Sequence, residues 1–241
     1  MAGMRADFDF GDDVVLVTGG SGALGSAVVE AFVATDATVC VTDVVQPASD
    51  DAELEPGSGY DFYPGDLTDE ADARDVVASV VDDHGTLDCL ANVAGTWRGG
   101  DPIHETDLET FDLLFDVNLK TAFLASKHAV PHLREGETQG AIVSVSARSS
   151  LEGGAGDGPY RAAKAGVRLL TETLAAENEG EVRANAVMPS VIDTPANREM
   201  MPDADHDSWV DPADIAEVFL FLCSDAASVT SGAAVPVYGE A

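Results

Sequence analysis

Basic residues are scarce in this sequence. Its 241 residues include 12 lysines and arginines against 44 aspartates and glutamates, which gives a formal net charge of -32. Nucleic acid is therefore excluded as a partner, because phosphate backbones are bound by cationic side chains. The acidic residues are spread along the chain, so they predict a carboxylate-covered surface whose self-repulsion is tolerable only where salt screens it. We expect a cytoplasmic protein of a halophile.

Long apolar runs are absent as well. No uninterrupted stretch approaches membrane-spanning length, and residues 1–11 contain acids but no apolar block typical of a signal peptide. We therefore expect no membrane partner.

Cysteine and histidine offer little for a disulfide framework or a metal site. Cys40, Cys89 and Cys223 are widely spaced and lie in apolar segments, which predicts buried, reduced thiols. The five histidines lack the spacings to cysteine or glutamate that are typical of zinc sites, so no metal is expected.

Short apolar, β-branched segments alternate with amphipathic ones along the whole chain. This alternation predicts an α/β fold: one Rossmann-type domain over residues 1–241, with a doubly wound parallel sheet of about seven strands flanked by helices. The strands are expected at residues 14–17, 38–42, 60–63, 87–91, 141–146, 182–188 and 233–237. Helices are expected at residues 26–34, 69–83, 106–134 and 212–224, and from Tyr160 onward.

Local signals set the expected helix starts and loops. Thr68 is expected to cap the helix at residues 69–83, and Thr106 with Glu109 resembles a capping box before the next helix. Residues 46–59 are polar and acidic, which predicts a surface loop. Residues 189–210 form a long connection of the kind that often acts as a lid.

A glycine-rich turn follows the first expected strand and opens the first helix. It runs Thr18-Gly19-Gly20-Ser21-Gly22-Ala23-Leu24-Gly25, and backbone N–H groups in this context can hold a pyrophosphate. Asp43 ends the second strand, where a carboxylate typically binds the adenosine ribose hydroxyls and repels a 2′-phosphate. With no arginine nearby, NAD(H) is favoured over NADP(H). Asp66, at the end of the third strand, could accept from the adenine amino group or could be a loop acid.

Tyr160 and Lys164 are the candidates for proton chemistry. Their spacing of four puts both side chains on one face of a helix, and a neighbouring cation favours the ionised phenol and lowers its pKa. The chain has only three lysines, so one at this spacing is less expected as casual surface charge. Asn118 interrupts an apolar helix face, and a buried asparagine either bonds locally or serves the site.

Over nearly its whole length, the chain resembles the short-chain dehydrogenase/reductase family. The motifs that carry this resemblance are Thr18–Gly25, Asp43, Asp66, Asn92–Gly95, Asn118 and Tyr160/Lys164. The resemblance implies an enzyme with Tyr160 as proton donor or acceptor, Lys164 holding the nicotinamide ribose, and Asn118 organising the proton relay. The cofactor-binding residues that it implies, together with the motifs above, are Gly19, Ser21, Gly22, Ala23, Leu24, Gly25, Asp43, Asp66, Leu67, Asn92, Ala94, Gly95, Tyr160, Lys164, Pro189, Ile192 and Thr194.

One position departs from the family pattern. The family usually has a serine thirteen residues before the tyrosine, and that position is Ala147 here. Ser146 and Ser149 are neighbours, and either could replace the serine only after a local shift; strand alternation is expected to point Ser146 to the opposite face. We include Ser146 in the candidate catalytic set.

The dihydropteridine reductase branch of the family also lacks that serine. Residues 19–26, 43–45, 93–100 and 193–209 resemble this branch, whose quinonoid dihydropterin substrate is an imine-like acceptor with less need for an oxyanion donor. The candidate substrate residues are Trp97, Ala147, Arg198 and Trp209.

Three functions remain open at this point. The first is an NAD(H)-dependent oxidoreductase acting on a small carbonyl, alcohol or imine-like substrate, with pterin reduction as its alternative. The second is a dinucleotide-binding protein without catalysis, which the Ala147 departure suggests. The third, a sugar-nucleotide epimerase, is disfavoured by the short C-terminal part. The family resemblance also implies a homodimer or homotetramer, formed through the helices beginning near Thr106 and Pro159.

Overall fold

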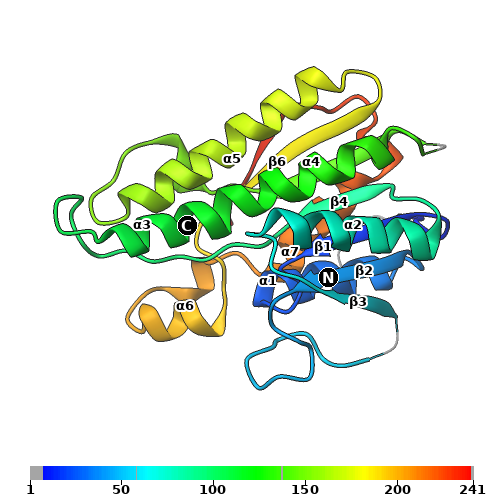
Figure 1. Cartoon of the computed structure of the whole chain (residues 1–241). Helices are drawn as coiled ribbons and strands as arrows, with labels where there is room; N and C mark the ends of the chain where they lie inside the picture. The colour runs from blue at the N-terminus through cyan, green and yellow to red at the C-terminus, as the bar shows by residue number, and fades with distance from the viewer. Residues whose placement is uncertain (1–7, 58, 137, 240–241) are drawn as a thin grey trace.

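The computed structural model describes residues 8–57, 59–136 and 138–239, and it contains one seven-stranded sheet flanked by helices (Figure 1). The strands run in the order β3-β2-β1-β4-β5-β6-β7, and every neighbouring pair is parallel. They are β1 (Val14–Thr18), β2 (Thr38–Asp43), β3 (Tyr60–Pro64), β4 (Cys89–Asn92), β5 (Gly140–Val145), β6 (Val182–Pro189) and β7 (Ala234–Val237). The expected doubly wound parallel sheet is confirmed.

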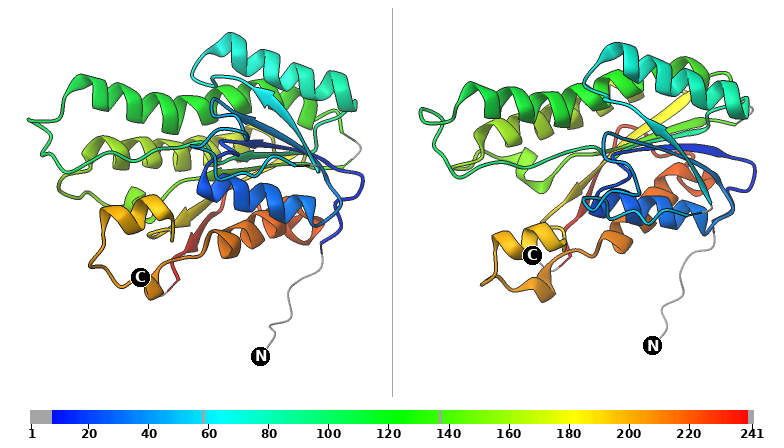
Figure 2. Two further views of the ribbon diagram at one scale, coloured as in Figure 1. Left: turned by 90° about the horizontal axis from the view of Figure 1, so that it is seen from below. Right: turned by 60° about the horizontal axis from the view of Figure 1, so that its bottom comes forward.

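Helices cover both faces of the sheet, as the two views of Figure 2 show. One face packs against α1 (Ala23–Val33) and α7 (Pro212–Cys223). The other packs against α2 (Glu70–His84), α4 (Thr121–Leu133) and α5 (Gly158–Glu177). The central strands are buried on both sides, which is why they are continuous runs of Val, Leu, Ile and Ala rather than alternating ones. No helix in the described ranges is long and apolar enough to cross a membrane.

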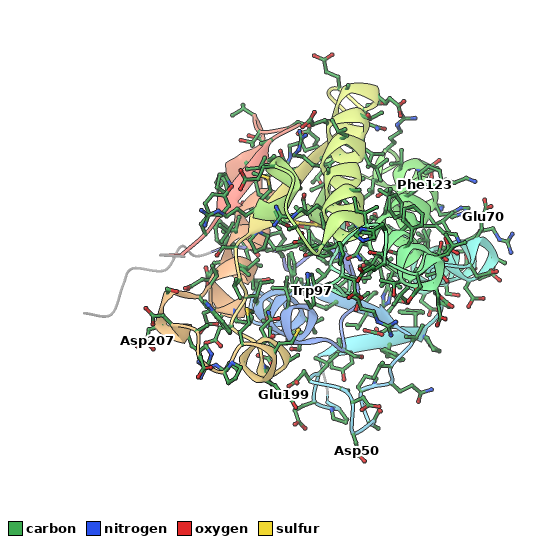
Figure 3. The ribbon with its side chains drawn as sticks, turned by 90° about the vertical axis from the view of Figure 1, so that its left-hand side faces the viewer. Asp50, Glu70, Trp97, Phe123, Glu199 and Asp207 are labelled. Carbon is green, nitrogen blue, oxygen red and sulfur yellow. A yellow bond between two sulfur atoms is a disulfide. The ribbon has the colours of Figure 1, made fainter. Side chains whose placement is uncertain are left out.

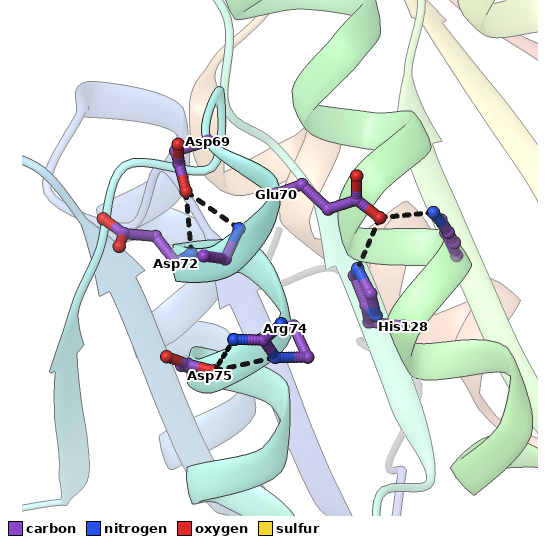
Figure 4. A network of polar contacts seen from close by, with 8 residues as sticks. Asp69, Glu70, Asp72, Arg74, Asp75 and His128 are labelled. Atoms are coloured by element: carbon purple, nitrogen blue, oxygen red, sulfur yellow. Dashed lines mark hydrogen bonds and ion pairs between the residues drawn. The ribbon is translucent and has the colours of Figure 1, made fainter.

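Two expected helix starts are wrong by one residue. Asp69, not Thr68, caps α2: its carboxylate accepts from the backbone N–H groups of Ala71 and Asp72, as Figure 4 shows. Thr68 instead donates its hydroxyl hydrogen to Asp66. Asp107 takes the place of the expected Thr106 and Glu109 box and accepts from the N–H of Thr110 at 2.6 Å. An aspartate next to a threonine competes well for the cap, because its charged carboxylate also favours the positive helix end.

The expected helix over residues 106–134 is not one regular element. It consists of α3 (Leu108–Phe115), a π-helical turn η1 (Asp116–Lys120) and α4. The π-turn shifts the register at Asn118, which the apolar periodicity of the sequence does not reveal.

The connection at residues 189–210 contains α6 (Pro195–Met200) and the short 3-10 helix η3 (His206–Ser208). It folds back on itself, because Ile192 bridges Val210 and the N–H of Asp193 donates to the carbonyl of Val210. Two further 3-10 turns are η2 (Arg148–Leu151) and η4 (Asp225–Ala227).

The expectation of three reduced thiols is wrong for two of them. Cys89 in β4 and Cys223 at the end of α7 form a disulfide with their Cα atoms 6.3 Å apart, whereas Cys40 is a free, buried thiol. The two partners are separated by 134 residues in sequence but belong to the same core cluster. Their proximity therefore depends on how α7 packs on the sheet.

Candidate active site

A cavity of about 800 Å³ opens at the carboxyl ends of the strands on the β1 side of the sheet. In open parallel sheets, ligands bind at this edge where the strand order reverses. The residues predicted for cofactor binding that line it are Gly19, Ser21, Gly22, Ala23, Leu24, Gly25, Asp43, Asp66, Leu67, Ala94, Gly95 and Thr194.

The glycine turn at the floor of this cavity has the close packing of a phosphate cradle. Gly19 has a φ of +66°, and a Cβ there would lie 2.6 Å from the Cα of Ala94. A Cβ on Gly22 would meet only the carbonyl of Gly19, at 3.6 Å, so the space above this turn is open. No described side chain caps α1, which leaves N–H groups of its first turn available to an anion. The turn therefore fits the pyrophosphate of a dinucleotide.

Ser21 ties this turn to the end of β2. Its N–H donates to one carboxylate oxygen of Asp43 at 3.0 Å, and its hydroxyl donates to the carbonyl of Val45 at 2.6 Å. The N–H of Val45 donates to the other oxygen of Asp43, also at 3.0 Å. These bonds fix the Asp43 carboxylate at the cavity wall, where a neutral ribose would meet a hydrogen-bond acceptor and an anionic phosphate would meet repulsion.

Five predicted cofactor residues lie outside the lining of this cavity: Asn92, Tyr160, Lys164, Pro189 and Ile192. Asn92 is buried, and its amide group donates to the hydroxyls of Ser126 and Ser144. These two bonds connect β4 to α4 and β5. Ala94 and Gly95, which follow β4, line the cavity. Thr18 supports that segment by accepting from the N–H groups of Val93 and Ala94.

Gly95 is the point at which the cavity meets the predicted proton-transfer residues. A Cβ on Gly95 would lie 2.9 Å from Oδ1 of Asn118 and 3.0 Å from Nζ of Lys164. Asn118 is buried; its amide donates to the carbonyls of Thr96 and Leu114, and its Oδ1 accepts from the N–H of Thr96. The asparagine thus pins the chain beside Gly95 to the π-helical turn.

Lys164 is buried in α5, where its ammonium donates to the carbonyl of Val145 at 2.9 Å. Burial disfavours the charged form and lowers the pKa of Lys164 to about 8. Tyr160 lies one turn earlier, and the centroid of its ring is 6.0 Å from the ammonium. The shared helix face expected from the spacing is confirmed by this approach.

The expected lowering of the Tyr160 pKa is wrong for this structure. Burial, and secondarily the carboxylate of Asp157, raises the pKa of Tyr160 to about 12. Lys164 does not offset this rise, because its ammonium is turned toward the Val145 carbonyl. Tyr160 is therefore a neutral phenol at physiological pH, which carries a transferable proton but is a weaker acid than a free tyrosine.

Ser146 and Ala147 directly follow β5, which ends at Val145, one residue before the expected strand end. The Ser146 hydroxyl is buried and donates to the carbonyl of Lys164 at 2.8 Å, with the Ser150 hydroxyl at 3.2 Å. It therefore anchors the strand to α5. Ala147 is buried as well and carries no polar group.

The predicted substrate residues are not gathered in one place. Trp97 lines a second cavity of about 370 Å³ together with Arg98, Gly156, Pro159 and Met200. Figure 3 shows the Trp97 side chain near the middle of the face that is turned toward the viewer. Arg198 forms an ion pair with Asp193. Trp209 packs against His206, with the two ring centroids 4.4 Å apart. Neither of these two residues lines either cavity.

Several cavity residues were not anticipated from the sequence. They include Thr42, Asp51, Glu53 and Asp116. Asp51 and Glu53 belong to the acidic surface loop expected at residues 46–59, and no periodicity or spacing in such a loop indicates which way it folds. Asp116 begins the π-helical turn, whose register the sequence does not show.

Comparison with known proteins relates the whole chain to oxidoreductases. The family model described as enoyl-(acyl carrier protein) reductase matches residues 20–239. A 3-oxoacyl-[acyl-carrier-protein] reductase of Thermotoga maritima is 33% identical and covers 94% of this chain and 96% of its own length. (+)-Borneol dehydrogenase 2 of Salvia officinalis is also 33% identical, with 94% and 88% covered.

Solved structures agree with these sequence relatives. The ligand-free aldohexose dehydrogenase of Thermoplasma acidophilum superimposes with a TM-score of 0.86 at 26% identity, covering 97% of this chain and 95% of its own. A short-chain type dehydrogenase/reductase of Mycobacterium ulcerans gives a TM-score of 0.87 at 26% identity, with 96% and 90% covered.

Proposed function

Because the chain belongs to the short-chain dehydrogenase/reductase family, we propose that it is an NAD(H)-dependent enzyme acting on a small carbonyl, alcohol or imine-like substrate. The observation that carries this proposal is the meeting of Lys164 and Asn118 at Gly95, on the wall of a cavity that fits a dinucleotide. The relatives named above include a ketone reductase and alcohol dehydrogenases, which supports a carbonyl or alcohol substrate.

In this proposal each residue has a distinct task. The glycine turn and the first turn of α1 hold the pyrophosphate, and Asp43 accepts from the adenosine ribose. The bound nicotinamide supplies or takes the hydride. Tyr160, neutral because of its raised pKa of about 12, donates the proton during reduction. Lys164 keeps a positive charge beside Gly95 below its pKa of about 8 and favours binding of the polar ribose edge there.

Pterin reduction is the second candidate. Ala147 has no hydroxyl, and the Ser146 hydroxyl is used by the carbonyl of Lys164, so neither side chain supports the developing oxyanion of a ketone. A quinonoid dihydropterin needs hydride and a proton but depends less on such a donor. The motif resemblance to dihydropteridine reductase supports the same substrate.

The test follows NADH consumption in multimolar KCl with quinonoid dihydropterin and, separately, a panel of ketones and β-ketoacyl thioesters. Tyr160→Phe removes the transferable proton, so we expect it to lose most turnover, on the order of a hundredfold or more. Tyr63→Phe is the matched control, because the Tyr63 hydroxyl contacts Asp83 and His84 away from the cavity.

The outcomes separate the candidates. Turnover confined to the pterin supports the second candidate, whereas turnover on ketones alone supports a general carbonyl reductase. Full activity of Tyr160→Phe would contradict the assigned role. Tight NADH binding without turnover on any acceptor would support a dinucleotide-binding protein without catalysis.

We further propose that the enzyme is a homodimer or homotetramer in the cytoplasm of a halophile. The charge of -32 supports a salt-screened environment. Exposed apolar side chains on α3, α4 and α5, namely Leu108, Phe111, Phe123 and Leu169, support an interface through these helices.

A further inference from the structure

The cavity proposed for the dinucleotide is lined by acids. Five carboxylates line it, and none of its described lining residues is lysine, arginine or histidine. The five are Asp43, Asp51, Glu53, Asp66 and Asp116. Asp116 is paired with Lys120 at 3.0 Å, but the salt bridges found among the described residues include none of the other four. An anionic ligand therefore enters a site of its own charge sign.

Glu53 is held at this site by a backbone hydrogen bond, and Asp51 lies two residues earlier on the same loop. The N–H of Glu53 donates to the carbonyl of Ser21 at 2.8 Å, and the N–H of Ser21 donates to the Asp43 carboxylate. Leu54 anchors the loop in the core, where it is almost fully buried. Ser21 of the glycine turn thus connects the loop to Asp43. Asp51 and Glu53 line the same cavity as Asp43.

Charge and hydrogen bonding act differently across such a wall. Asp43 can bind the ribose and reject a 2′-phosphate by direct contact. Both interactions persist in salt because they act over a distance shorter than the screening length. Asp51 and Glu53 are more exposed and act through the intervening solvent. At roughly 8 Å, one such carboxylate changes the affinity for one added negative charge about twofold at the dielectric of water and about thirtyfold at the effective dielectric of a protein surface. In molar salt the screening length falls to about 3 Å, and this effect disappears.

We propose that Asp51 and Glu53 are specificity-determining residues that reject a 2′-phosphorylated dinucleotide by charge, in addition to Asp43. This inference rests on the proposed NAD(H) function. It has a second consequence: affinity for the dinucleotide itself rises with salt, which is the opposite of the dependence found at basic phosphate sites. The preference for NAD(H) over NADP(H) weakens over the same salt range.

The test measures dissociation constants for NADH and NADPH by ligand fluorescence, independently of any substrate. The double variant Asp51→Asn/Glu53→Gln removes both charges and keeps the size of both side chains. Asp50→Asn is the matched control: Asp50 lies on the same loop but does not line the cavity, and Figure 3 shows it at the outer tip. Titrations are made in about 3 M KCl and at the lowest salt at which every variant keeps its far-ultraviolet circular dichroism.

We expect the NADPH-to-NADH ratio of dissociation constants to fall about tenfold or more between low and high salt in the wild type. The double variant should show at low salt a ratio close to the wild-type ratio at high salt, and Asp50→Asn should behave as the wild type. Adenosine 2′,5′-bisphosphate and 5′-AMP should give the same pattern, because the effect belongs to the adenosine end. The single variants should each give part of the change.

Two results would overturn the inference, and they differ in what else they affect. If both dinucleotides bind but the double variant keeps the wild-type ratio at low salt, Asp43 alone sets the preference and the proposed function stands. If neither dinucleotide nor the adenosine fragments bind at any salt, the proposed function fails and the inference fails with it.

Discussion

Tyr160 and Lys164 respond to one buried environment in opposite directions. Burial disfavours charge, so it lowers the pKa of the Lys164 ammonium to about 8 and raises that of the Tyr160 phenol to about 12. Near neutral pH the phenol is therefore protonated, but with a pKa of about 12 it is a weak acid, and a further contact that stabilises the phenolate is needed for it to act efficiently as acid or base.

Asp157 offers a direct test of this electrostatic arrangement. Its carboxylate disfavours the Tyr160 phenolate, and it is also bonded to Arg161 at 2.6 Å. Asp157→Asn should lower the Tyr160 pKa, both by removing the negative charge and by releasing the guanidinium. In pH–rate profiles of alcohol oxidation, where the tyrosine must accept a proton, we expect the rising limb to move to lower pH. Glu152→Gln should leave it in place, and an unmoved limb in Asp157→Asn would show that burial alone sets the pKa.

Asp13 gives a second pH prediction, on stability. Burial, with the neighbouring acids Asp88 and Asp225, raises its pKa to about 6. A carboxyl whose pKa is raised by folding contributes stability that is complete below its unfolded pKa of about 4 and is lost as pH rises through about 6. Asp13→Asn should therefore raise the free energy of unfolding near neutrality by about 1 kcal/mol after allowance for solvent screening, and with it the melting temperature, and have no effect near pH 4.

Thermal unfolding followed by circular dichroism across this pH range checks the sign. Asp12→Asn is the control, because Asp12 is exposed and contributes only a minor part of the shift. A stabilisation that persists unchanged at acidic pH would mean that hydrogen bonding by the amide, rather than removal of charge, is responsible.

Arg183 acts at the scale of a helix. It lies in β6, it is buried, and its guanidinium donates to the carbonyls of Leu222, Cys223, Ser224 and Ala227 at 2.5 to 3.4 Å. The last carbonyls of a helix have no partners within it, and a cation there also complements the negative helix end. Arg183, a residue of β6, therefore supplies hydrogen-bond donors to the carboxyl-terminal end of α7 and fixes this helix to the sheet.

Replacing Arg183 by Met should leave those carbonyls buried without donors. We expect a loss of roughly 3 kcal/mol in the free energy of unfolding, measured by urea denaturation at constant KCl. Arg183→Lys should restore part of it, because one ammonium cannot reach all four oxygens. Arg74→Met, at an exposed pair with Asp75, should change stability little. Equal effects at both positions would refute the capping role.

The same elements show what a sequence can and cannot predict. The strands, the glycine turn and the place of Asp43 follow from local patterns, because continuous apolar runs, glycine spacing and a strand-end acid each act within a few residues. The π-turn at Asn118, the Cys89–Cys223 disulfide and the cavity position of Glu53 depend on packing between distant segments. The bond from the Ser146 hydroxyl to the Lys164 carbonyl likewise joins segments that are distant in sequence.

For the whole molecule, the high negative charge and the exposed apolar helix faces have opposing effects on assembly. Like-charged subunits repel each other at low salt, whereas burial of apolar surface favours association at any salt. Phe123 on α4 and Leu169 on α5 are 47% and 53% exposed, and Figure 3 shows Phe123 on the outer side of the helix layer. Screening by salt should therefore shift the balance toward the oligomer.

Phe123→Glu should disrupt that assembly. It adds a charge to the apolar face and removes an aromatic side chain, so we expect the molar mass measured by light scattering in multimolar KCl to fall toward that of the 25.0 kDa chain. Phe221→Glu is the control, since Phe221 is 40% exposed on α7, which covers the opposite face of the sheet. A wild-type protein that is monomeric in high salt would exclude the interface. If only Phe221→Glu dissociates the oligomer, the subunits associate through the α7 face instead.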